Sequence, residues 1–226
     1  MIKLSKRMKE TNAQVDEKKS YPLAEAVSRL NKFPKVKFDE TVELHFHLNI
    51  DTANTDQLLR GTVLLPHGTG KKIKIAVFCK GEQVQKAQEA GADYVGGTDL
   101  IEKVANGMMD FDSVIASPDM MRDLSKLGKV LGPRGLMPSP KAGSVTTDIE
   151  RVIKELRAGK IIFKADKQGG VHVGIGKRSF SNEQIVENAN QLIEAINHAR
   201  PAYVKGNLIK SLSLSSTMGA GIKVAV

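Results

Sequence analysis

The chain has 226 residues, and 34 Lys and Arg against 25 Asp and Glu give a formal net charge of +9. The 41% of apolar residues is ordinary for a folded protein, and no apolar run reaches the roughly 18 residues that a membrane-spanning helix needs. A single cysteine, Cys79, excludes an internal disulfide and a Cys-rich zinc framework, and it fits a reducing cytoplasm. Aromatic residues at 4% argue against a sheet that stacks flipped bases on rows of Phe or Tyr.

The first 67 residues predict one helix followed by two strands. Pro22 suits the first turn of a short helix whose apolar residues share one side. Residues 41–50, TVELHFHLNI, alternate apolar and polar side chains, which is typical of a strand with one buried and one wet face. A shorter strand at 62–65 is stopped by a proline.

The middle of the chain alternates predicted strands with predicted helices. Apolar runs at 73–78, 94–95 and 113–116 indicate strands, and helical patterns follow at 82–90, at 99–105, after Pro118 and from 149 to 156. Asp148 is a candidate N-cap, and Gly159 a stop signal, for the last of these helices. Such alternation predicts parallel crossovers and a small open sheet, a three-layer α/β (Rossmann-like) arrangement.

After Gly159 the pattern resembles the beginning of the chain again. Strands are predicted at 160–165 and 171–175, with a Gly-Gly turn signal between them. Ser181 with Gln184 three residues later forms a capping box that opens a long amphipathic helix. Two further strands fit 208–214 and 222–226.

These patterns predict two domains of mixed α/β and α+β class. Residues 1–67 and 159–226 together build a split α+β domain, and residues 68–158 form an α/β domain inserted into it. The segment 67–70 and Gly159 are candidate paired hinges. The two terminal segments carry +7 of the net charge and the insertion +2, so we expect a polyanionic partner at the split domain.

No constellation of catalytic or metal-binding type stands out. His45 and His47 share one strand face, but no Cys or carboxylate pattern completes a metal site, and we expect no metal and no cofactor. Cys79 follows an apolar strand and is expected to act as a small buried hydrophobe. Carboxylate pairs such as Asp39/Glu40 have the appearance of ordinary turn residues.

Two other functional classes remain as alternatives. A nucleotide-dependent enzyme would use the α/β insertion, although Gly81 is alone where a dinucleotide fingerprint needs three glycines. A DNA-binding regulator would need a recognition helix after a short turn, and no such pattern is found.

The segment Leu127–Gly143 is the strongest candidate for chemistry in the insertion. It combines four glycines and three prolines in a long non-periodic stretch, and such loops are usually functional or disordered. Lys129, Arg134 and Lys141 give it a basic surface suited to phosphates. The alternative is a mobile surface connection, which its apolar residues disfavour.

A second constellation joins the two ends of the chain. Lys35, Lys37 and Phe38 precede the wet strand face, and residues 211–219 form a hydroxyl-rich tract that ends in glycine. Hydroxyls and a glycine backbone can approach phosphates and 2′-hydroxyls closely, and Glu43 can accept a bond from a 2′-hydroxyl or a base amino group. A polar edge strand explains the serine tract equally well.

Five motifs, in order along the chain, give it a resemblance to the family of bacterial large-subunit ribosomal protein L-one, the mobile-stalk proteins. They are KFDETVELH from Lys37, RGTVLLPHGTGK at 60–71, GADYVGG at 91–97, KLGKVLGPRGLMPSPKAG at 126–143 and SSTMG at 215–219. The resemblance implies a non-enzymatic, cytoplasmic, ribosome-bound protein, monomeric when free and without a membrane partner. It implies binding to large-subunit (23S) rRNA, help in releasing deacylated tRNA from the exit site, and repression of its own operon through its mRNA.

Carried over by motif, the resemblance places the principal RNA site on the split domain. It implicates Lys37, Phe38, Thr41 and Glu43 from the first tract, and Ser211, Thr217, Met218 and Gly219 from the last. It implicates, more weakly, Lys164, Lys167 and His172 from the strands between them. The inserted domain, with Lys129, Arg134 and Lys141, is expected to face tRNA.

Overall fold

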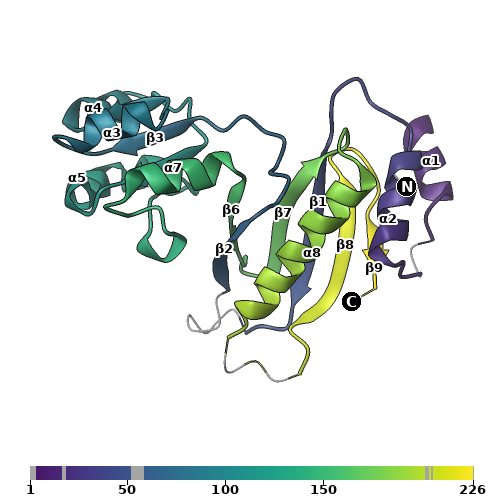
Figure 1. Ribbon diagram of the computed structural model, residues 1–226. Coiled ribbons are helices and arrows are strands. Elements are labelled where there is room, and N and C mark those ends of the chain that lie inside the picture. Colours follow the sequence, from purple (N-terminus) through teal and green to yellow (C-terminus); the bar gives the residue numbers. More distant parts are fainter. Residues whose placement is uncertain (1–3, 17–18, 52–58, 202–203, 205, 226) are drawn as a thin grey trace. The chain divides into compact units, whose positions relative to one another are not determined.

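The computed structural model describes residues 4–16, 19–51, 59–201, 204 and 206–225, and they divide into two compact units (Figure 1). The first unit comprises Met1–Gly70 with Ile161–Val226, and the second comprises Lys71–Lys160. The mixed α/β class expected from the sequence agrees with the helices and several sheets found here.

A four-stranded antiparallel sheet forms the centre of the first unit. Its strands stand in the order β7 (Gly170–Lys177), β1 (Thr41–Leu48), β8 (Ile209–Ser216) and β9 (Ile222–Val224). Strand β1 therefore pairs with segments more than 120 residues away along the chain, on both of its sides.

Helices cover one face of this sheet. Helices α2 (Leu23–Lys32) and α8 (Asn182–His198) pack against the apolar side chains of the four strands, and Figure 1 shows α8 crossing the strands. The predicted capping box at Ser181 and Gln184 is present at the start of α8. Helix α1 (Lys6–Ala13), capped by Ser5, was not predicted because its residues are almost all polar.

The chain also forms a separate two-stranded sheet. It consists of β2 (Arg60–Leu64) and β6 (Lys160–Lys164). Strand β6 thus pairs with β2, whereas β7, which follows it after the Gly-Gly turn, joins the four-stranded sheet.

The second unit has three layers around a small parallel sheet. Its strands stand in the order β4 (Tyr94–Gly96), β3 (Ile75–Phe78) and β5 (Ser113–Ala116). Helices α3 (Gln83–Glu89) and α7 (Ile149–Arg157) cover one face, and α4 (Thr98–Ala105), α5 (Met121–Leu124) and α6 (Gly128–Leu131) cover the other. Alternate residues of β3 enter the two cores, so this sheet is buried on both sides.

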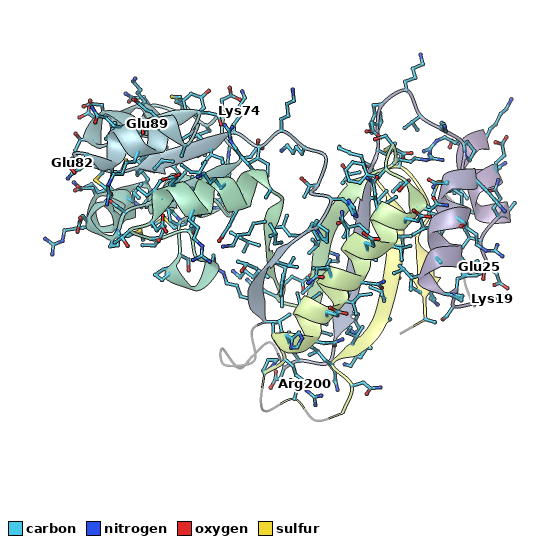
Figure 2. The ribbon with its side chains drawn as sticks, in the orientation of Figure 1. Lys19, Glu25, Lys74, Glu82, Glu89 and Arg200 are labelled. Carbon is cyan, nitrogen blue, oxygen red and sulfur yellow. The ribbon has the colours of Figure 1, made fainter. Side chains whose placement is uncertain are left out.

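The segment Leu127–Gly143 is more ordered than its composition predicts. It contains α6 and the 3-10 turn Pro140–Ala142, after the 3-10 turns Pro118–Met120 and Ser125–Leu127. Helix α6 and the 3-10 turn show that the prediction of one long irregular loop was wrong. The expectation that its apolar residues pack is confirmed, since Leu131 is fully buried and Leu136 packs against the same core. Charged side chains such as Lys74, Glu82 and Glu89 remain on the outside of this unit (Figure 2).

Candidate nucleic-acid interface

The face of the four-stranded sheet opposite the helices is polar, and we call it the open face. It follows from the alternation along β1, β7 and β8, which register shifts interrupt near Val42 and Leu48, and the apolar side chains of these strands all enter the core. Its side chains are those of Thr41, Glu43, His45 and His47 of β1, His172 of β7, Ser211, Ser213 and Ser215 of β8, and Lys223 of β9. Gly174 stands opposite Glu43 and places no side chain beside it.

The two tracts that the sequence analysis joined do meet at one end of this sheet. The Thr41 N–H donates to Oγ1 of Thr217 at 3.0 Å, and the Thr217 N–H donates to the Thr41 carbonyl at 3.0 Å. The predicted meeting of distant segments is therefore confirmed. We call residues 37–41 and 216–219 together the rim.

Two large apolar side chains are exposed on the rim. Phe38 is 55% exposed and Met218 is 47% exposed, although both are residues that folding usually buries. Lys37 is exposed beside Phe38, and Lys177 donates to Oγ1 of Thr41 at 2.9 Å. The rim thus combines cations, hydroxyls and apolar surface, the mixture that contacts phosphates, sugars and bases in folded RNA.

A buried ion pair fixes the rim. Glu40 is 1% exposed and accepts hydrogen bonds from Nη1 of Arg178 at 2.6 Å, from Oγ of Ser216 at 3.1 Å and from the Met218 N–H at 3.0 Å. Because these donors come from the residue after β7, from β8 and from the turn after β8, one carboxylate holds the separate segments together. The sequence-based view of Glu40 as an ordinary turn residue was wrong.

Arg178 extends this anchor into the preceding loop. Its guanidinium donates to the carbonyls of Leu30, Asn31, Phe33 and Pro34. It therefore joins the end of α2 and the chain leading to Lys37 with the edge of the sheet. A buried charge without a partner would be costly, so Glu40 and Arg178 depend on each other.

The alternation of the strand sequence indicated that Glu40 is buried, and this signal was missed. Every even position from 42 to 48 is buried, and the same parity extended one step back places Glu40 on the core side. The buried positions 212 and 214 place Ser216 there in the same way. A carboxylate at a core position requires a partner, and Arg178 and Ser216 meet that requirement.

Of the remaining predicted residues of the first unit, three lie apart from the rim and Gly219 belongs to it. Ser211 is on the open face but pairs with His47, at the end of β8 far from Thr217. Lys164 is exposed on β6 in the two-stranded sheet, and Lys167 is exposed in the turn before β7. Gly219 belongs to the rim, where a Cβ would lie 2.5 Å from Oγ of Ser216, so the turn needs glycine.

His172 belongs to a hydrogen-bonded cluster on the open face. Nδ1 of His45 lies 2.9 Å from Nδ1 of His172, and Nε2 of His45 lies 2.8 Å from Oγ of Ser215. Partial burial, and then the charge of His172, lower the pKa of His45, while Glu43 acts in the opposite direction. Sequence reasoning did not find this cluster because strand pairing across 127 residues was needed to see it.

Only part of the predicted basic surface in the second unit is described. Lys129 on α6 and Arg134 after it are exposed, and the side chain of Lys141 lies outside the described residues. Cys79 is fully buried in this unit, as predicted, and burial raises the pKa of its thiol. Across the described residues, no three His, Cys, Asp or Glu side chains are placed to hold a metal ion.

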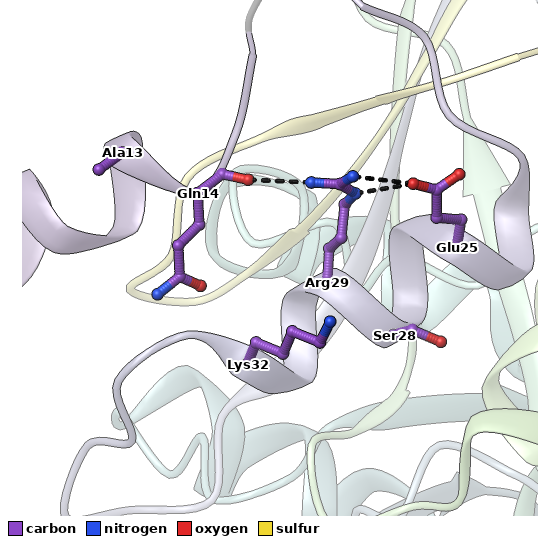
Figure 3. A pocket seen from close by; sticks show the side chains of 6 residues that line it. All are labelled: Ala13, Gln14, Glu25, Ser28, Arg29 and Lys32. Atoms are coloured by element: carbon purple, nitrogen blue, oxygen red, sulfur yellow. Dashed lines mark hydrogen bonds and ion pairs between the residues drawn. The ribbon is translucent and has the colours of Figure 1, made fainter.

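A pocket between α1 and α2 is a weaker candidate for a site (Figure 3). Arg29 projects into it and donates to the Glu25 carboxylate at 3.0 Å and to the Gln14 carbonyl at 3.2 Å. Its guanidinium also lies 4.2 Å from the ring of Tyr21. Because Glu25, Gln14 and Tyr21 already interact with the Arg29 guanidinium, that group is poorly available to a ligand in this pocket.

Comparison with known proteins identifies the family. Residues 30–220 match the model of the ribosomal protein L1p/L10e family, which is most of the chain. The chain belongs to the ribosomal protein L1p/L10e family. The matched range contains the whole rim and open face except Lys223, and all of the second unit.

Curated relatives agree with this assignment over nearly their whole length. The chain is 54% identical to the large ribosomal subunit protein uL1 of Protochlamydia amoebophila, over 97% of this chain and 93% of the relative. It is 52% identical to the protein of the same name from Thermosipho africanus, over 99% and 97% of the two chains. These relatives are named as ribosomal proteins and not as enzymes. Within the described ranges, no helix is both long and apolar enough to cross a bilayer.

Proposed function

We propose that this chain is a structural component of the large ribosomal subunit that binds large-subunit rRNA through the rim and the open face of its first unit. The observation that carries the proposal is the exposure of Phe38 and Met218 on a rim held rigid by Glu40 and Arg178. Membership of a ribosomal family supports rRNA as the partner, and the geometry of the rim supports this location for the site.

The binding energy would come from two physically different sources. Fixed hydroxyls and exposed apolar groups at Thr41, Thr217 and Met218 read the shape of folded RNA, which single-stranded or duplex competitors lack. Exposed cations such as Lys37 add a phosphate term that weakens with salt, by about 0.9 log units or less per contact. The rim therefore supplies the specificity, and non-specific electrostatic attraction to phosphates supplies part of the affinity.

The finer roles belong to the same proposal. The second unit, with exposed Lys129 and Arg134, would face tRNA while the first unit holds the rRNA of the mobile stalk, and would assist release of deacylated tRNA from the exit site. Repression of the chain's own operon would follow if its mRNA folds into a copy of the rRNA site. The free protein is proposed to be a monomer.

Footprinting on purified large-subunit rRNA tests the proposal. The full chain should protect one compact structured region, and an excess of duplex DNA should not displace it. The variant Met218→Ala should lose that protection at concentrations at which the wild-type chain gives it. Protection spread evenly along the rRNA, or displacement by duplex DNA, would show only diffuse electrostatic binding.

A further inference from the structure

Four polar side chains form a continuous chain of contacts across the open face. Oγ of Ser215 lies 2.8 Å from Nε2 of His45, whose Nδ1 lies 2.9 Å from Nδ1 of His172. Nε2 of His172 lies 3.6 Å from Oδ2 of Asp166, in the turn before β7. The chain thus runs from β8 through β1 and β7 to a carboxylate.

The sheet register holds the two imidazoles against each other. His45 and His172 are direct cross-strand partners, with ring centroids 5.1 Å apart and planes tilted by 55°. The charged or titratable groups on the same strands and on the turn before β7 include two that interact with the pair, Glu43 and Asp166. The others on these strands are His47 of β1, Lys177 of β7, Lys210 of β8 and Lys223 of β9.

The donors and acceptors fix where the protons lie when both imidazoles are neutral. One N–H must lie between the two Nδ1 atoms, because two bare nitrogens would repel at 2.9 Å. If His45 supplies it, bare Nε2 of His45 accepts the Ser215 hydroxyl proton, and the Nε2–H of His172 points at Asp166. Every donor in this series of contacts then points toward Asp166. The Ser215 hydroxyl donates to His45 and is not available to a ligand.

One added proton reverses the direction of the two hydrogen bonds that join His172, His45 and Ser215, and it breaks neither of them. A doubly protonated His172 donates from Nδ1 to His45, and its Nε2 lies at ion-pair distance, 3.6 Å, from Oδ2 of Asp166. His45 then carries its proton on Nε2 and donates to Ser215, whose own hydroxyl proton becomes free to point outward. A second added proton would set two N–H groups against each other, so the pair accepts one proton and not two.

We propose that RNA binding to the open face is linked to the uptake of one proton by the His45–His172 pair. This inference rests on the proposed function, and it adds a regulation of the same surface. The proton comes from solvent and leaves one unit of positive charge on the pair. It also turns Ser215 into an outward hydrogen-bond donor, and both changes favour a phosphate or 2′-hydroxyl oxygen at the sheet.

The electrostatics of the surrounding groups agree with a single-proton pair. The pKa of His45 is lowered by partial burial and by His172, so His45 is the member that stays neutral. Backbone N–H groups of Gly170 and Gln168 lower the pKa of Asp166, which keeps that carboxylate ionised beside His172. The ionised carboxylate of Asp166 therefore lies on the His172 side of the pair.

The sign of the linkage follows directly. Bound phosphate raises the pKa of the pair, so binding is favoured below the ordinary histidine pKa of about 6.5 and is weakened as the pH rises through the raised value. For one charge near a partly screened phosphate we expect affinity to fall by about fivefold between pH 6.0 and 7.5. Tighter coupling could not exceed tenfold per pH unit for one proton.

Calorimetry with the full chain and the rRNA fragment that it protects in the footprint provides the test. Titrations at pH 6.8 in buffers of different ionisation enthalpy count the protons taken up on binding. We expect up to one proton for the wild-type chain and less than a fifth of that for His172→Gln, whereas His45→Gln keeps His172 beside Asp166 and should retain part of the uptake. Ser215→Ala should keep the proton uptake but lower the affinity at pH 6.0.

Two matched variants control for the RNA and for other histidines. His198→Gln removes an exposed imidazole at the end of α8, and Ser213→Ala removes a hydroxyl from the same strand face as Ser215. Both should retain the wild-type proton count. Because every variant meets the same RNA, protonation of the RNA itself cancels from the comparison.

The outcomes separate this inference from the proposed function. Equal proton uptake by the wild type, His45→Gln and His172→Gln would overturn the proton-linked pair while RNA binding stands. Uptake of no proton by the wild type would do the same. Failure of the wild type to bind the fragment at any pH would instead contradict the proposed function.

Discussion

The two sheets of this chain differ in how many of their faces are covered. The parallel sheet of the second unit has helices on both sides, and its central strand β3 is apolar and buried along its whole length. The antiparallel sheet of the first unit has helices on one side and a row of Thr, Glu, His and Ser on the other. The uncovered face has no structural need for these particular side chains, so it is the place to look for a partner.

The largest expected effect is the difference in stability between alanine substitutions of one phenylalanine in each unit. Phe78 is fully buried in the second unit, and Phe78→Ala should lower the free energy of unfolding by about 3–5 kcal/mol. Phe38→Ala should leave stability unchanged but weaken binding to the protected rRNA fragment by about tenfold, because the exposed ring contacts RNA and not the core. Urea denaturation and filter binding give the two numbers. A large loss of stability in Phe38→Ala would place its ring in the core and contradict the contrast.

A second prediction concerns the anchor under the rim. Glu40→Ala leaves Arg178 buried without its partner and should cost about 3 kcal/mol of unfolding free energy, as measured by urea denaturation. Glu150→Ala is the matched control, because its ion pair with Lys154 is exposed, and it should leave stability unchanged. Equal effects of the two substitutions would mean that the buried pair does not hold the rim.

Binding should distinguish the rim from the outer surface of the second unit. Thr217→Ala and Met218→Ala should each weaken binding to the protected fragment by about tenfold, or about 1.4 kcal/mol. Lys103→Ala removes an exposed cation from α4 and should change affinity much less. Similar losses in all three variants, measured at one salt concentration, would indicate diffuse electrostatic attraction without a specific site.

The smallest predicted effect is a difference in RNA affinity between alanine substitutions of two nearby glycines. Gly219→Ala places a Cβ 2.5 Å from Oγ of Ser216 and disturbs the rim, so we expect about threefold weaker RNA binding. Gly221→Ala meets no atom within 4 Å and should bind as the wild type does. Both affinities are measured by filter binding, and a loss in Gly221→Ala as large as that in Gly219→Ala would remove the steric explanation.

The sequence predicted the elements of the fold better than their partners. The alternation over 41–50 and the capping box at Ser181 depend on neighbours within a few residues, and both were found as expected. The pairing of β6 with β2 depends on contacts across 100 residues, which local patterns do not encode. Helix α1 was missed because an almost wholly polar segment gives no periodic signal.

The candidate site was predicted in its position but not in its support. The meeting of Thr41 with Thr217 followed from expecting the two chain ends in one domain. The Glu40–Arg178 pair and the His45–His172 pair were missed, since both arise only when distant strands are in register. The function of every rim residue in RNA binding stays a prediction until RNA is present.

Cleavage of bound rRNA from probes tethered to the two tracts of the rim is the most direct test of the central claim. Cys79 is fully buried, so an iron-chelate reagent should label only introduced thiols in Lys37→Cys, in Ala220→Cys directly after the rim, and in Lys103→Cys as a control in the second unit. If both tracts grip one folded RNA, the probes at 37 and 220 should cut the same short stretch of rRNA, and the probe at 103 should not. Cuts at unrelated stretches from 37 and 220 would contradict the account.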